Sequence, residues 1–148
     1  MTAQYEHDIV AWANEQARLL RAGRFDLIDI DNVAEEIEDV GKSEQRELIG
    51  RMAVLLAHLL KWQYQPERRS KSWRFTIGTQ RKQIWIALEE TPSLKARLSD
   101  NSWWERVWLE ATRHAAEETG LFDFPMSCPW AFDEIMDENW WPEVDAKN

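Results

Sequence analysis

Hydrophobic residues recur at three- and four-residue steps along most of the chain, which is the period of an amphipathic α-helix. They predict a first helix over about 6–22 that stops at Gly23, and a long helix over about 32–64. The stripe of the long helix stays in phase across Gly41, which favours one continuous helix. The alternative is two helices, with Ser43 capping the second. The predicted inward-facing residues are Tyr5, Ile9, Trp12, Ala13, Gln16 and Leu20 in the first helix and Val33, Ile37, Val40, Gly41, Glu44, Leu48, Met52, Leu55, Leu59 and Trp62 in the second.

Local signals mark where these helices begin and end. Asn32 and Glu35 have the spacing of a capping box at the start of the long helix. Pro66 ends it, and Ser70 or Ser72 can cap the helix that follows. The further helices are expected over about 72–90, 92–98, 102–119 and 131–138.

No segment alternates between apolar and polar residues as a strand does. At 148 residues with 44% hydrophobic and 30% charged side chains, the chain has the size and composition of one globular domain. We therefore expect an all-α fold, a single-domain helical bundle of about five to six helices with one long central helix, over residues 1–148.

Charge is spread unevenly along the chain, which has a net charge of −9. Residues 66–85 carry six basic side chains against one acidic side chain, a local net charge of +5. An acidic protein repels phosphate at long range, so nucleic acid is a disfavoured partner. A local basic patch can still bind one anion or an acidic protein.

The cysteine content and the N-terminal residues indicate the cellular compartment. Cys128 is the only cysteine, so it cannot form an internal disulfide, and this fits a reducing compartment. The first residues lack the basic and apolar regions of a signal peptide, and no stretch approaches a membrane span. We expect a cytoplasmic protein without a membrane segment.

Ten tryptophans is an unusually high number for a chain of this length. Five lie on the predicted apolar stripes, and large rings at such positions usually fill the core between helices. Trp140 and Trp141 either pin the C-terminal segment to the body or form an exposed patch for a partner. The five predicted core tryptophans are Trp12, Trp62, Trp73, Trp104 and Trp108.

The polar face beside the hinge (residues 58–74, where the long helix meets the next) is the main candidate site. It combines cationic side chains with aromatic rings, which suits phosphate, a carboxylate or a stacked base. In the alternative interpretation the arginines pair with acids of the long helix and cap its last carbonyls. The candidate binding residues are Arg51, His58, Lys61, Gln65, Arg68, Arg69, Trp73 and Arg74.

Metal chemistry has weaker support in the sequence. Glu35, Glu36 and Asp39 imitate the first Mg²⁺ motif of all-α nucleoside-triphosphate pyrophosphatases, but no second acidic pair follows at a suitable spacing. A solvated acidic face near a helix N-terminus, which the helix dipole favours, is the simpler explanation of the run. The three histidines have no metal-ligand spacing, and Cys128 has no nearby histidine in sequence. We predict no catalytic residue, no metal ligand and no cofactor.

The stretch HLLKWQYQPERRSKSW, residues 58–73, is the most distinctive part of the chain. It resembles the bacterial family known as Domain of Unknown Function 29. The same family is matched by YEHDIVAWANEQARLLRAGRFDLIDIDNVAEEIED near the N-terminus and by FPMSCPWAFDEIMDENWWP near the C-terminus. The resemblance covers nearly the whole chain and implies an all-helical bacterial domain, without a transferable activity or catalytic residue.

Three functions follow from these observations. The favoured one is a non-enzymatic helical interaction or regulatory module, with a protein partner or self-association. The first alternative is a binder of a phosphorylated small molecule or nucleic acid at the hinge. The second is a metal-dependent hydrolase that uses Glu35, Glu36 and Asp39.

Overall fold

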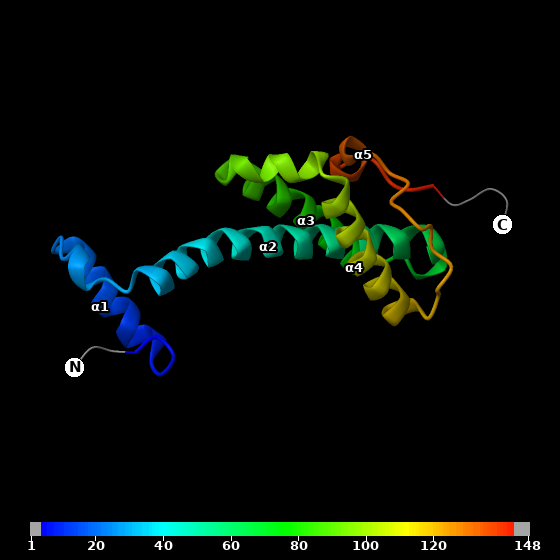
Figure 1. Cartoon of the computed structure of the whole chain (residues 1–148). Helices are drawn as coiled ribbons and strands as arrows, with labels where there is room; N and C mark the ends of the chain where they lie inside the picture. Colours follow the sequence, from blue (N-terminus) through cyan, green and yellow to red (C-terminus); the bar gives the residue numbers. More distant parts are fainter. Residues whose placement is uncertain (1–3, 144–148) are drawn as a thin grey trace. The chain divides into compact units, whose positions relative to one another are not determined.

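The computed structural model describes residues 4–143, and this part of the chain is built from helices without a strand (Figure 1). The predicted all-α fold with one long helix is therefore confirmed. The α-helices are α1 (Ile9–Arg21), α2 (Ile30–Tyr64), α3 (Lys71–Glu90), α4 (Asn101–Thr119) and α5 (Phe132–Met136), joined in part by 3₁₀ helices at Phe25–Leu27, Pro66–Arg68 and Pro92–Ser99. No helix within residues 4–143 is both long and apolar enough to cross a membrane.

Helix α2 runs through Gly41 without a break and has 35 residues, as its unbroken stripe predicted. Its start differs from the prediction, because the helix already begins at Ile30 and Asn32 lies inside it. The side-chain amide of Asn32 donates to Oδ2 of Asp29 at 2.9 Å, and the Asp29 carbonyl accepts from the Val33 backbone N–H at 2.9 Å. The capping box at Asn32 was therefore wrong, since Asp29 precedes the first turn.

Other helix ends follow the local signals. Ser70 caps α3, with its hydroxyl accepting from the Trp73 N–H at 3.2 Å. Gly23 and Gly120 follow α1 and α4 with φ of 72° and 76°, a left-handed conformation that glycine adopts without strain. The short helix expected over 92–98 is a 3₁₀ helix at Pro92–Ser99.

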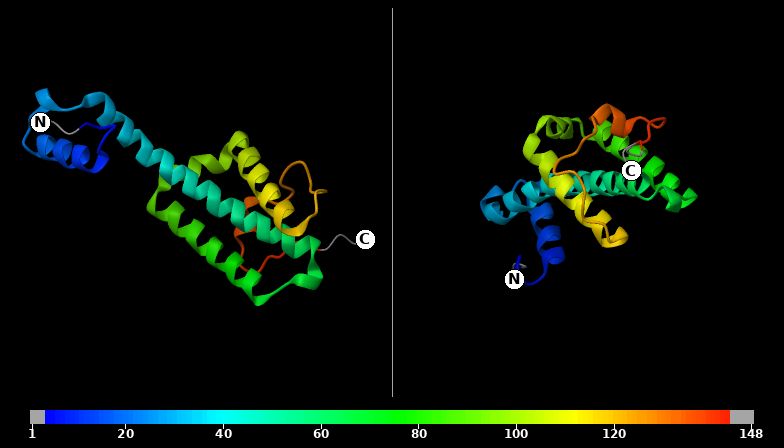
Figure 2. Two further views of the ribbon diagram at one scale, coloured as in Figure 1. Left: turned by 90° about the horizontal axis from the view of Figure 1, so that it is seen from below. Right: turned by 90° about the vertical axis from the view of Figure 1, so that its right-hand side faces the viewer.

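The chain divides into two compact units, which we call unit 1 (up to Glu44) and unit 2 (from Gln45 on). In unit 2, α3 and α4 lie on opposite sides of the second half of α2 (Figures 1 and 2). Apolar side chains from all three helices and from α5 fill the space between them. The largest fully buried side chains are Leu48, Met52, Leu55, Leu56, Leu59, Leu60, Ile77, Ile84, Val107 and Ile135.

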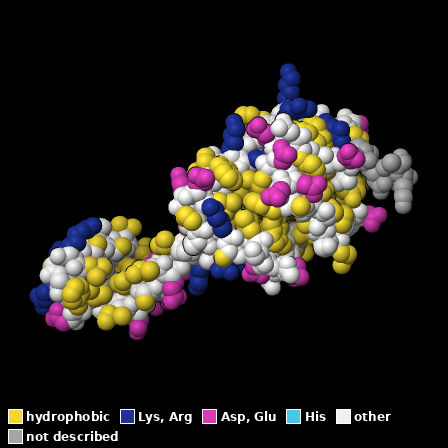
Figure 3. Space-filling model, turned by 90° about the horizontal axis from the view of Figure 1, so that it is seen from above, with side chains coloured by type: hydrophobic (Ala, Val, Ile, Leu, Met, Phe, Trp, Pro, Cys, Tyr) yellow, Lys and Arg dark blue, Asp and Glu magenta, His cyan; other side chains and the backbone are white. Residues whose placement is uncertain are grey.

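Unit 1 has a small interior, because Trp12 and Gln16 are its only buried residues among those described. Polar contacts hold it together: the Trp12 indole N–H donates to Oδ2 of Asp29 at 2.9 Å, and the Asp29 N–H donates to Oε1 of Gln16 at 2.8 Å. Hydrophobic side chains gather on the face of unit 1 seen in Figure 3. The prediction that Ile9, Leu20, Ile37 and Val40 face a core was wrong, since all four are exposed.

The tryptophans mostly take the positions expected of core residues. Trp12, Trp62 and Trp108 are buried, whereas Trp73 and Trp104 are half-buried at the edge of the core. Trp141 is half-buried and lies 4.3 Å from Trp62 between ring centroids. The C-terminal tryptophans therefore pack against the body of unit 2.

Candidate functional site

The polar face of α2 is already engaged by neighbouring groups. Nη2 of Arg51 lies 3.0 Å from Oε1 of Glu47, one helical turn away. Nδ1 of His58 lies 2.9 Å from the carbonyl oxygen of Val54. Burial, more than any other cause, lowers the pKa of His58 below the usual 6.5, because an imidazolium loses hydration there. His58 is thus a half-buried, hydrogen-bonded residue within α2.

Lys61 is buried in the structure, although its spacing had placed it on the polar face. Its ammonium forms an ion pair and hydrogen bond with Glu118 of α4, and Nζ lies 4.9 Å from the ring centroid of Trp73. The hydrogen bond from Lys61 is the largest cause that lowers the pKa of Glu118. This pair joins α2 to α4 within unit 2.

The arginines beyond Pro66 contact tryptophan rings and a helix-end carbonyl. Nε of Arg69 donates to the carbonyl oxygen of Trp62 at 2.8 Å, and its guanidinium lies 4.8 Å from the Trp62 ring. The Arg74 guanidinium lies 5.3 Å from the ring centroids of both Trp62 and Trp141. These contacts stabilise the end of α2 and the ring pair beside it.

Gln65 and Arg68 complete the predicted hinge set. Gln65 is half-buried, and Arg68 is exposed with its backbone N–H donating to the Gln65 carbonyl at 3.0 Å. The structure therefore brings Arg69, Trp73 and Arg74 around the end of α2, and it turns Arg51 toward Glu47 on the same helix.

The acidic run at the start of α2 also has an internal contact. The Tyr5 hydroxyl donates a hydrogen bond to Oε1 of Glu36. Among residues 4–143, no three or more His, Cys, Asp or Glu side chains lie close enough together to hold a metal ion.

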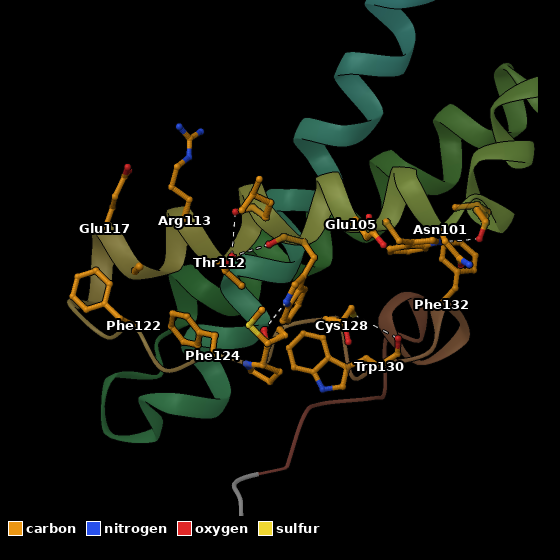
Figure 4. A pocket seen from close by; sticks show the side chains of 18 of the residues that line it. Asn101, Glu105, Thr112, Arg113, Glu117, Phe122, Phe124, Cys128, Trp130 and Phe132 are labelled. Atoms are coloured by element: carbon orange, nitrogen blue, oxygen red, sulfur yellow. Dashed lines mark hydrogen bonds between the residues drawn. The ribbon is translucent and has the colours of Figure 1, made fainter.

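A surface groove of about 1260 Å³ lies between α4 and the segment 121–132 (Figure 4). The lining as a whole is mainly apolar, and six of its residues are aromatic. Three large apolar side chains are exposed along it: Leu109 at 70%, Phe122 at 83% and Met126 at 98%. The aromatic lining residues are Trp104, Trp108, Phe122, Phe124, Trp130 and Phe132.

Hydrogen bonds fix the aromatic floor of this groove. The Trp108 indole N–H donates to the Pro125 carbonyl at 2.8 Å, which ties α4 to the opposite wall. The Trp104 indole N–H donates to the Leu98 carbonyl at 2.8 Å. The rings of Trp108 and Trp130 meet edge to face, 5.8 Å apart between centroids. These contacts within the chain therefore fix the shape of the floor without a ligand.

Two further polar side chains of the lining donate to backbone carbonyls. The Thr112 hydroxyl donates to the Trp108 carbonyl at 3.0 Å. The Cys128 thiol donates to the Trp130 carbonyl, with 3.6 Å between the sulfur and the oxygen. Burial is the main cause that raises the pKa of Cys128, so the thiol stays protonated at neutral pH. Arg113 and Glu117 point away from the floor in Figure 4.

This groove was not predicted from the sequence. Its signal is the segment LFDFPMSCPW, residues 121–130, which reads as a loop with two prolines yet carries six apolar or aromatic residues besides them. Such residues in a loop indicate a wall that packs on a helix. Cys128 lies within this segment, four residues before α5 begins at Phe132.

The fold and the groove define an all-α protein with an open, aromatic-lined surface groove and a hinge stabilised by cation–ring contacts. The chain belongs to the family described as Domain of unknown function DUF29, whose model matches residues 4–141. No match is found among curated proteins or among solved structures. The resemblance noted in the sequence is thus confirmed over nearly the whole chain.

Proposed function

We propose that this protein is a non-enzymatic helical interaction module that binds an amphipathic helix of a partner protein in the groove between α4 and residues 121–132. The observation that carries the proposal is the exposure of Leu109, Phe122 and Met126 around one preformed groove. Single exposed apolar residues are ordinary, but a contiguous apolar surface around a concave site is typical of an interaction site.

The chemistry of the floor argues for an apolar ligand surface. Trp104, Trp108, Thr112 and Cys128 already donate to carbonyl groups of the chain itself. A ligand that placed polar atoms on the floor would lose hydration without gaining a hydrogen bond from these four donors, which costs free energy for each unpaired group.

The same argument selects the conformation of the bound segment. A strand added to a protein needs backbone partners at a sheet edge, and residues 4–143 contain no strand. A helix satisfies its own backbone and presents only side chains, so it can dock on apolar walls. We therefore expect anchors spaced at three and four residues along one face of the bound helix.

A photo-crosslinking amino acid at Met126 or Phe122 in the native host tests this proposal. We expect a discrete adduct with one protein, with the crosslinked site mapping to an amphipathic helix of that protein. Leu109→Glu should abolish the adduct without unfolding the chain, because Leu109 is exposed. The same crosslinker at Phe25, which is exposed in unit 1, is the matched control and should give no such adduct.

Two results would contradict the proposal. One is a crosslinked adduct whose yield Leu109→Glu leaves unchanged, or whose yield is the same when the crosslinker is placed at Phe25. The other is a native mass spectrum of the purified chain with a bound lipid that Leu109→Glu removes, which would make the groove a site for an acyl chain.

A further inference from the structure

The apolar stripe of α2 continues from the core of unit 2 into unit 1, where it is uncovered. Ile37 and Leu48 are eleven residues apart, which is about three helical turns, so they share one face of the helix. Leu48 is 1% exposed, whereas Ile37 is 67% exposed. Ile30 and Val40 are exposed to the same extent. The first half of α2 therefore presents a helix face of core character without a cover from its own unit.

The surroundings of this face are strongly acidic. Residues 1–44 contain eleven Asp and Glu against four Lys and Arg, a net charge of −7. Asp31 and Glu38 directly follow Ile30 and Ile37, so carboxylates flank the apolar stripe on one side. A partner that fits this face is apolar at its centre and basic at its margin.

Helix α3 carries a surface with that chemistry. Phe75, Trp85 and Ile86 are exposed at 75%, 58% and 44%, on the helix face opposite the buried Ile77 and Ile84. Lys71 and Lys82 are exposed on the same outer face. We call these five residues the outer face of α3.

We infer that the chain self-associates by docking the acidic α2 face (Ile30, Ile37, Val40) of one copy on the outer face of α3 of a second copy. Each copy carries both surfaces, so a twofold dimer makes the contact twice, as such symmetry requires. Pairing the α2 face with itself would bring two segments of −7 charge together, which electrostatics opposes. A second copy is therefore the occupant that the charges favour.

The mass of the full chain in solution tests this inference directly. We expect sedimentation equilibrium to give twice the 17.6 kDa of one chain, with dissociation at high salt because the margins are ionic. Ile37→Glu should give a monomer that keeps its helical circular dichroism, since the residue is exposed. Phe25→Glu is the control and should leave the dimer intact. A wild-type monomer at concentrations up to roughly 100 µM would overturn the inference.

Charge exchange identifies which surfaces meet. Glu38→Lys and Lys82→Glu should each weaken the dimer, and mixing the two variants should restore association between unlike chains. The pairing of α2 with α3 would be overturned if Ile37→Glu dissociates the dimer but a mixture of the Glu38→Lys and Lys82→Glu variants does not associate. Leu109→Glu, in the groove, should not change the mass, so this experiment and the crosslinking experiment fail independently.

Discussion

At the scale of single residues, the phenol of Tyr5 donates a hydrogen bond to the carboxylate of Glu36. This bond, more than the nearby acids, raises the pKa of Tyr5 to about 12, because ionisation would place two anions in contact. The folded pKa lies above the usual 10.0, so the pair favours folding below pH 10 and loses this contribution as the pH rises toward 12.

The prediction is that Tyr5 remains protonated at about pH 11, where an unperturbed phenol is mostly ionised. Tyrosinate absorbance in a chain with Tyr64→Phe measures it without a second tyrosine. Glu36→Gln removes the anion and should return the ionisation toward its ordinary range. Equal titration of both proteins would show that Glu36 does not control Tyr5.

Lys61 and Glu118 give a second prediction at this scale. Glu118→Gln leaves a buried ammonium without its carboxylate, so we expect the free energy of unfolding to fall by roughly 1–3 kcal/mol. Urea denaturation measures the change, and Glu117→Gln at the exposed neighbouring position is the control. The pKa of Glu118 is lowered in the folded state, so the contribution exists at neutral pH and is lost as the pH falls below 4.5.

At the scale of elements, two glycines should respond in opposite ways to substitution by alanine. Gly41 lies inside α2 with open space at its Cβ position, whereas Gly120 follows α4 with φ of +76°. We expect Gly41→Ala to stabilise the chain by about 0.5–1 kcal/mol, because alanine restricts the unfolded chain and favours a helix. Gly120→Ala should destabilise it by about 1 kcal/mol, because alanine is strained there. Thermal unfolding followed by circular dichroism compares the two, and changes of the same sign would contradict this account.

The helices were predictable from the sequence because their signals are local. Periodicity placed α2, α3 and α4 within two residues of their observed ends, and Ser70 and Gly120 mark two of these ends. Periodicity shows which face of a helix is apolar, but it does not show whether another segment covers that face. This is why the stripe was correctly predicted as core at Leu48 and wrongly at Ile37.

The candidate site was less predictable, for a physical reason. The cationic face of the hinge was visible in sequence. However, Glu118, which pairs with Lys61, and Trp141, one of the two rings beside Arg74, lie 57 and 67 positions away along the chain. The groove likewise depends on how residues 121–132 return along α4. Such contacts are set by tertiary packing, which local spacing does not encode.

At the scale of the whole molecule, Arg81 holds the C-terminal segment on the body of unit 2. This side chain is 5% exposed, and its guanidinium donates to the carbonyls of Ile135 at 2.7 Å and Trp140 at 2.8 Å. It also lies 5.4 Å from the Trp141 ring. One buried cation therefore joins α3, α5 and the segment that follows.

Arg81→Lys should lower the free energy of unfolding by about 2 kcal/mol, because a single ammonium cannot reproduce two directed hydrogen bonds. We also expect limited proteolysis to cleave the chain after α5 faster than in the wild type. Gln83→Ala, at an exposed position of the same helix, is the control. Unchanged cleavage would mean that the ring contacts alone retain the segment.

The exposure of Trp85 has an optical consequence. All ten tryptophans lie in the described part, and Trp85 is the only one of them that is exposed. A neutral quencher such as acrylamide should therefore act mainly on the fluorescence of Trp85. This ring belongs to the outer face of α3, so dilution that separates two copies should increase the fraction of tryptophan fluorescence that acrylamide quenches. The emission of the native chain therefore reports its association without a label.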